Sequence, residues 1–104
     1  MYILKFSIYY KEDTKSSIRY IKHVLQNPVA AQRLKIEIEK TYTKIKQNPL
    51  IYPKVPVEHL AAKGYRFALI GNYMLFFKVK NNVINIDRFL YGPRDWANIL
   101  ENMN

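Results

Sequence analysis

The first apolar pattern in the chain has a period of two residues. Over residues 2–9, apolar side chains alternate with polar ones such as Lys5. The apolar positions are Tyr2, Leu4, Phe6 and Ile8. Successive side chains of a strand point to opposite faces, so this alternation is typical of a half-buried strand. We therefore predict a first strand over residues 2–9.

The chain then changes to apolar spacing of a helical kind, in two segments. Asp13 or Thr14 can cap a first helix that runs to about residue 26, and Asn27-Pro28 can open a second that runs to about residue 47. Proline fits the first helical position because its missing N–H costs no hydrogen bond there. The apolar stripes are Ile18, Ile21, Val24 and Leu25 in the first helix, and Ala31, Leu34, Ile38, Tyr42 and Ile45 in the second. The short break between the helices predicts an antiparallel hairpin.

Three prolines in residues 48–58 predict a loop with no regular element. Three β-rich runs follow, separated by Gly71-Asn72 and Asn81-Asn82. Gly and Asn tolerate the positive φ that tight hairpin turns require. The runs cover about residues 64–70, 73–80 and 83–91. They predict a three-stranded antiparallel meander.

Gly92-Pro93 ends the last run, and residues 95–102 predict a short helical turn with Asp95 near its start. The predicted order is β-α-α-β-β-β. We therefore expect an α+β fold in one domain, residues 1–104, with the helical hairpin against an antiparallel sheet.

Composition narrows the chemistry. The 104 residues are 49% hydrophobic and include no cysteine, which excludes disulfides, thiol catalysis and thiolate metal sites. No metal-ligand spacing or glycine-rich phosphate loop is visible, so we expect no metal and no cofactor. The interrupted apolar start is too short for a signal peptide or a membrane span. We expect a cytoplasmic protein with no membrane contact.

Charge points to the kind of partner. Seventeen Lys and Arg against eight Asp and Glu give a formal net charge of +9. Such a small basic domain attracts polyanions at long range and binds them by counterion release. Nucleic acid, an acidic protein, or simply a solvated basic surface all fit this balance.

Individual polar residues give few conventional catalytic groups. His23 and His59 are best read as ordinary surface or packing histidines. Arg88 alternates with apolar residues in the last run, and an arginine in an apolar row is costly unless it is paired. We interpret it as a structural anchor whose partner the sequence does not identify. Its expected neighbours on that strand face are Ile84, Ile86 and Leu90.

An ordered series of short motifs resembles the RelE/ParE superfamily, the toxins of type II toxin–antitoxin modules. The series spans nearly the whole chain, and its order and spacing are more specific than any one dipeptide. It consists of Asn27-Pro28 with Ala30-Ala31, Asn48-Pro49, Tyr52-Pro53, Tyr65-Arg66, Gly71-Asn72-Tyr73, Leu90-Tyr91-Gly92 and Arg94-Asp95.

The resemblance implies one of two mechanisms. RelE-like members are ribosome-dependent endoribonucleases that cut mRNA, and ParE-like members are described as poisoning DNA gyrase. Arg66 and Arg94 fall at functional cations of the nuclease branch, but Met74 and Ala68 stand where that branch carries an arginine and a lysine. The motifs around Gly71 and Tyr91 look more ParE-like, although Tyr91 replaces a histidine common there.

We therefore expect a growth-inhibiting toxin that acts on gyrase and is neutralised by a cognate acidic antitoxin. The first alternative is an mRNA endonuclease that acts with the ribosome. The second is a non-toxic module that only binds its antitoxin. The functional candidates are Arg66, Tyr91 and Arg94, which would be catalytic only in the nuclease, where Tyr91 or Tyr73 could relay a proton.

Overall fold

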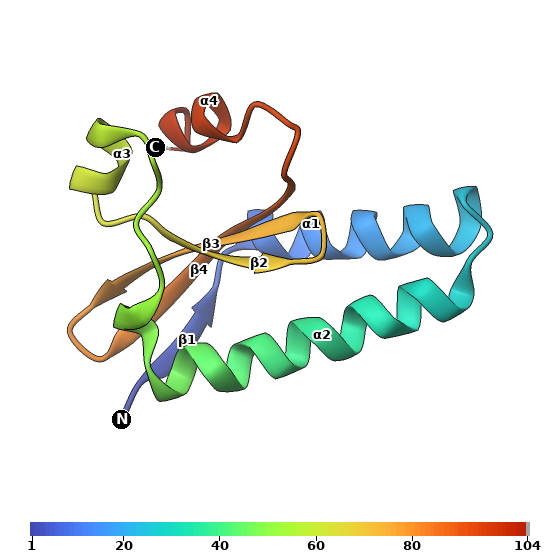
Figure 1. The fold of residues 1–104 in the computed structure, drawn as a ribbon, viewed down its shortest axis with the longest axis horizontal. Helices are drawn as coiled ribbons and strands as arrows, with labels where there is room; N and C mark the ends of the chain where they lie inside the picture. Colours follow the sequence, from blue (N-terminus) through green and yellow to red (C-terminus); the bar gives the residue numbers. More distant parts are fainter. Residues whose placement is uncertain (104) are drawn as a thin grey trace.

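The computed structural model describes residues 1–103 (Figure 1). The α+β fold, the helical hairpin, the meander and the short C-terminal helix are all as predicted. The elements are β1 (Ile3–Phe6), α1 (Ile8–Arg19) continued by a π-helix η1 (Tyr20–Val24), α2 (Pro28–Gln47), a 3-10 helix η2 (Pro49–Ile51), α3 (Glu58–Ala62), β2 (Arg66–Ile70), β3 (Tyr73–Lys80), β4 (Val83–Tyr91) and α4 (Trp96–Glu101). No helix within these residues is both long and apolar enough to cross a membrane.

The sheet has the strand order β1-β4-β3-β2 and is mixed. The meander β2-β3-β4 is antiparallel, but β1 pairs with β4 in parallel, with Ile3 opposite Val83 and Phe6 opposite Ile86. The expectation of an antiparallel sheet was therefore wrong for β1. No tight turn joins β1 to β4, and the intervening hairpin and strands leave the chain free to return in the same direction.

The first strand is shorter than predicted, and the first helix begins earlier. Ser7 ends β1 and caps α1, because its Oγ accepts the N–H of Tyr10 at 3.0 Å and donates to the carbonyl of Asp87 at 2.6 Å. The prediction of a cap at Asp13 or Thr14 was wrong, since both lie inside α1. Ile8, which continued the alternation, is 70% exposed at the helix start. Side-chain capping by serine overrides the period-two pattern here.

The proline-rich segment is more ordered than predicted. Pro49 opens the 3-10 helix η2, and a five-residue helix, α3, lies just before β2. Proline suits the first position of a helix, so the three prolines did not prevent a short one. The segment also contributes Val55 and Leu60 to the core.

Two helical layers cover the two faces of the sheet (Figure 1). The hairpin α1–α2 covers one face, and α3 with α4 covers part of the other. The hairpin-side core contains Tyr10, Ile38, Ile45, Ala68, Ile70, Leu75, Phe77, Ile84, Ile86 and Phe89. The other core contains Val55, Leu60, Tyr65, Met74, Phe76, Leu90 and Leu100.

A hydrogen bond inside the hairpin-side core joins the two helices. The hydroxyls of Tyr10 on α1 and Tyr42 on α2 lie 2.6 Å apart. Burial, together with this hydrogen bond, raises the pKa of Tyr10. Both phenols therefore stay neutral, and each satisfies the other in an apolar setting.

A β-bulge in β4 changes which side chains share a face. Phe76 pairs with Arg88 and Phe77 pairs with Ile86, so Asp87 is an extra residue on β4. Ile84 and Ile86 lie in the hairpin-side core, whereas Leu90 lies in the other. The predicted common face of Ile84, Ile86, Arg88 and Leu90 is therefore wrong, because one inserted residue reverses the alternation.

A groove between the hairpin and the sheet

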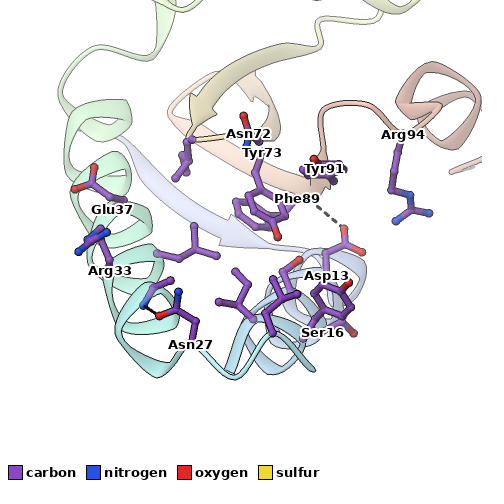
Figure 2. A pocket seen from close by; sticks show the side chains of 18 residues that line it. Asp13, Ser16, Asn27, Arg33, Glu37, Asn72, Tyr73, Phe89, Tyr91 and Arg94 are labelled. Carbon is purple, nitrogen blue, oxygen red and sulfur yellow. Dashed lines mark hydrogen bonds between the residues drawn. The ribbon is translucent and has the colours of Figure 1, made fainter. Parts of the chain in front are cut away.

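An open groove of about 1060 Å³ separates the helical hairpin from one end of the sheet (Figure 2). The buried side of α1, the π-helix and the start of α2 form one wall. The β2–β3 turn and the end of β4 form the other. The lining residues are Asp13, Ser16, Ser17, Tyr20, Ile21, Leu25, Asn27, Ala30, Arg33, Leu34, Glu37, Ile70, Gly71, Asn72, Tyr73, Phe89, Tyr91 and Arg94.

Three aromatic rings form the sheet side of this groove. Tyr73 stacks on Phe89 with ring centroids 4.8 Å apart and planes 10° from parallel. Tyr91 meets Tyr73 nearly edge-on at 5.6 Å. Tyr73 and Tyr91 are opposite each other on β3 and β4, so the strand pairing itself brings the rings together. The result is an apolar surface that carries two phenolic hydroxyls.

A charged pair fixes α1 against β4 beside these rings. Asp13 accepts two hydrogen bonds from the Arg88 guanidinium, at 2.7 Å from Nε and 2.9 Å from Nη2. It also accepts the backbone N–H of Phe89 at 3.0 Å. The Arg88 guanidinium further lies 5.5 Å from the ring centroid of Tyr9. This geometry supplies the partner that the sequence left unassigned, and it makes Arg88 a structural link between helix and sheet.

The turn after β4 is held close to the β2–β3 turn. Gly92 donates its N–H to the carbonyl of Asn72 at 2.7 Å. A Cβ at Gly92 would lie 3.1 Å from the same oxygen, so the close approach favours glycine. Asp95 then caps α4 through the N–H of Asn98. Arg94 lies between these two fixed points and is exposed.

The charges of the groove lie on its opposite rims. Arg33 and Glu37 lie on α2, and Arg94 lies across the groove beyond β4 (Figure 2). Within residues 1–103 the Arg94 guanidinium has no hydrogen-bond or ion-pair partner. Its charge is therefore available to a ligand.

The structure separates the three candidate residues. Tyr91 and Arg94 line the groove, but Arg66 lies at the other end of β2. Arg66 donates to the carbonyls of Tyr52 at 2.6 Å and Leu50 at 3.4 Å. Four residues of strand, about 13 Å at about 3.3 Å per residue, separate it from Ile70 at the groove. Arg66 therefore fastens the segment after α2 and does not face Tyr91 or Arg94.

Lys78 and His59, two further basic residues considered in the sequence, are also engaged. Lys78 pairs with Asp87 at 3.5 Å and lies 4.6 Å from the ring centroid of Tyr65. Burial raises the pKa of the Asp87 carboxyl, and the Lys78 ammonium offsets part of that rise. His59 on α3 contacts Glu101 on α4. No lining position of the groove is a histidine.

Several lining residues were not singled out from the sequence. The local sequence indicates Asp13 only as a possible helix cap and indicates no role for Phe89. One signal was available for Asp13: it follows Tyr10 by three residues and precedes Ser17 by four. That spacing puts a carboxylate on the buried side of α1, where it requires a partner.

Comparisons with known proteins agree with this architecture. One solved structure, described as "Chromosomal ParDE TA system from P. aeruginosa", has a TM-score of 0.70 and 22% identity over 88% of this chain and 96% of that chain. A second, described as "crystal structure of YafQ from E.coli strain BL21(DE3)", has a TM-score of 0.54 and 15% identity over 88% and 93%. At these identities the likeness shows the fold alone. No curated protein matches the sequence significantly.

The family comparison is more specific than the structural one. The family described as "ParE toxin of type II toxin-antitoxin system, parDE" matches residues 4–96, from β1 to the start of α4. The match includes the hairpin, the meander and every residue that lines the groove. The resemblance noted in the sequence is thereby confirmed, and this chain belongs to the ParE toxin family of type II toxin–antitoxin systems.

Proposed function

We propose that this toxin arrests growth by inhibiting DNA gyrase and that a cognate acidic antitoxin neutralises it by binding in the groove. The observation that carries the gyrase proposal is the separation of the candidate cations. Arg94 is free at the groove, whereas Arg66 is bound to loop carbonyls at the far end of β2.

A nuclease of the alternative kind requires several cations around one phosphate. Met74 and Ala68, which stand at two of the expected cationic positions, are 9% and 3% exposed and belong to the two cores. Lys78, which could have substituted for one of them, is paired with Asp87. These placements support a mechanism other than efficient mRNA cleavage.

The test compares two reactions with the same purified toxin. One contains gyrase and supercoiled DNA, and the other contains translating ribosomes and mRNA. We expect inhibition of gyrase that Arg94→Ala abolishes or strongly reduces, with no mRNA cuts. Lys35→Ala is the matched control, because it removes one exposed cation from α2 outside the groove. Codon-linked mRNA cuts at low toxin, with gyrase unaffected, would replace this proposal with the nuclease.

The groove fits a peptide partner of mixed character. Its walls offer apolar side chains for burial, and its rims offer Arg33 and Arg94 for carboxylates. An amphipathic segment that lays an apolar face into such a groove is a common mode of peptide recognition. Opposite charge on the two proteins, with +9 on this one, would accelerate the encounter.

Two leucines of nearly equal exposure test where the antitoxin binds. Leu25 lines the groove and is 56% exposed, and Leu50 lies outside it and is 55% exposed. We expect Leu25→Ser to weaken antitoxin binding about tenfold or more, since burying a leucine contributes about 1.5–3 kcal/mol. Leu50→Ser should leave the affinity unchanged.

The measurement is co-purification, followed by titration, with the product of the neighbouring reading frame. If the tagged toxin comes away alone at physiological salt, the antitoxin proposal fails. Binding without growth inhibition by the free protein would instead favour the non-toxic binding module. Equal effects of the two leucine variants would show that the antitoxin does not bind specifically in the groove.

A further inference from the structure

A row of cations runs along the outer side of α1. Lys11, Lys15 and Arg19 follow one another at intervals of four residues, and Lys22 continues the row into the π-helix. All four side chains are exposed. At about 1.5 Å per residue, the row is about 16 Å long. We call these four residues the α1 basic row.

The charge of this row is not neutralised within the protein. None of its four members forms an ion pair with any described residue. The two acidic residues of α1 are Glu12 and Asp13, and Asp13 is already bound to Arg88. Only Glu12 remains to offset four cations.

The second helix has the same number of cations outside the groove but a different pattern. Lys35, Lys40, Lys44 and Lys46 are interspersed with Glu37 and Glu39, and Lys40 pairs with Glu37 at 3.7 Å. This mixture is typical of a solvated helix face. The α1 basic row therefore stands out by its local excess of positive charge rather than by its number of lysines.

We propose that the α1 basic row binds the phosphate backbone of duplex DNA. The choice of DNA rests on the proposed action on gyrase, whose substrate is duplex DNA, so the row would hold the toxin beside the DNA on which the enzyme works. Regularly spaced cations on an exposed helix provide phosphate contacts without base recognition.

The composition of the row favours a polyanion over a protein partner. Protein interfaces depend on buried apolar or aromatic anchors at their centre. Among residues on this side of α1, only Ile8 is a large exposed apolar side chain, and it lies at the first turn. The apolar anchors of the hairpin, such as Tyr20 and Leu25, line the groove instead.

The two surfaces lie on different sides of the same helix. Asp13, Ser16 and Ser17 of α1 line the groove, and none of the four cations does. A peptide in the groove would therefore leave the α1 basic row uncovered. The toxin should bind DNA whether or not its groove is occupied.

The test measures binding to a fluorescent duplex DNA of arbitrary sequence as salt is varied. Four phosphate contacts give a slope of about −3.6 in log K against log salt, or about a hundredfold loss of affinity from 50 to 200 mM. The variant Lys11→Gln, Lys15→Gln, Arg19→Gln, Lys22→Gln should lose this slope. The control Lys35→Gln, Lys40→Gln, Lys44→Gln, Lys46→Gln makes the same change in net charge on α2 and should keep most of it.

Three results would overturn the inference: no salt-dependent DNA binding by the unaltered toxin, equal losses in the two quadruple variants, or loss of antitoxin affinity in the α1 variant with DNA binding unchanged. Thermal melts and the conservative change Arg19→Lys, which should retain DNA binding, separate loss of charge from loss of fold.

Failure of this inference is distinct from failure of the gyrase proposal. Normal gyrase inhibition by an unaltered toxin that shows no salt-dependent DNA binding would refute only the former, and DNA binding without gyrase inhibition would refute only the latter.

Discussion

Arg66 at the start of β2 and Arg94 just after β4 are arginines in opposite situations. Arg66 is bound by the carbonyls of Tyr52 and Leu50. At the groove, Arg94 follows a turn fixed by the bond between Gly92 and Asn72, and its guanidinium has no partner within residues 1–103. Both looked like functional cations in the sequence. The difference shows that availability to a ligand depends on neighbouring acceptors, which the local sequence does not reveal.

Arg88, whose partner Asp13 lines the groove, extends this comparison. Its side chain and that of Asp13 are 15% and 12% exposed, and they share two hydrogen bonds. Three arginines of the same meander region therefore range from mostly buried and paired, through half-buried and bonded to carbonyls, to free. The loss of unfolding free energy when each arginine is replaced by alanine should therefore decrease in the same order, from Arg88 through Arg66 to Arg94.

Arg88→Ala should cause the largest loss of stability. Removing one partner of a mostly buried pair leaves Asp13 uncompensated, and such losses are about 3 kcal/mol or more. Denaturant unfolding with unchanged m-value measures it. Asp13→Asn combined with Arg88→Ala should lose less than the sum of the single variants. Strict additivity, or an unchanged melt for Arg88→Ala alone, would mean that the pair does not hold α1 to β4.

Arg66→Ala should cause a smaller loss, of about 1–2 kcal/mol. The Tyr52 carbonyl would lose a charge-assisted hydrogen bond, but water can reach the partly buried site. Arg66→Lys should recover part of the loss, because an ammonium can still donate to one carbonyl. The same denaturant series provides the measurement. A loss of gyrase inhibition with no change in stability would instead assign Arg66 a functional role.

Asp87→Asn should change the unfolding free energy still less, and the direction of the change with pH shows whether burial or the ion pair dominates at this carboxyl. Burial raises the folded-state pKa of Asp87 above its unfolded value, despite the offset from Lys78. The folded state thus holds this proton more tightly, and the associated stability is lost as pH rises from about 4 through the folded pKa. The unfolding free energy of Asp87→Asn, measured relative to that of the unaltered protein, should therefore increase as pH rises from about 3.5 to 7.

Unfolding curves at the two pH values test this sign. Lys78→Gln is the control, because removal of the offsetting ammonium should increase the dependence of the protein on pH. If Asp87→Asn instead becomes less stable relative to the unaltered protein as pH rises toward 7, the ion pair with Lys78 outweighs the burial of the carboxyl.

Arg94→Ala should have the smallest effect on stability, within about 0.5 kcal/mol, as expected for an exposed side chain without partners. It should nevertheless remove most of the toxicity in a growth assay, since the free charge at the groove is lost. A clear loss of stability, or unchanged toxicity, would show that Arg94 has a structural role like that of Arg66 and is not available for function.

Local patterns predicted most elements of the fold. Asn27 caps α2 through the N–H of Ala30 as predicted, with Pro28 at the first position. The turns at Gly71 and Asn81 both have positive φ, as hairpin turns of this kind require. Two of the errors arose where a local feature interrupted a regular pattern: the predicted alternation ran past Ser7, and one bulge residue, Asp87, reversed the faces of β4.

The candidate site was predicted only in part. Tyr91 and Arg94 do lie together at the groove, and their nearness in sequence made that possible. Asp13 lies about 75 residues from its partners Arg88 and Phe89, and no local pattern connects them. The separation of Arg66 from the groove also depended on a contact with the segment after α2.

The sequence by itself determined the helices, the turns, the meander and the excess of positive charge, because these follow from the conformational preferences and charges of residues near one another in the chain. Only the tertiary structure decided the parallel pairing of β1, the partners of Arg66 and Arg88, and the groove in which Arg94 is free. Those features depend on which distant acceptors and apolar faces meet when the hairpin packs on the sheet. Packing of distant segments therefore decides which cations remain available for function.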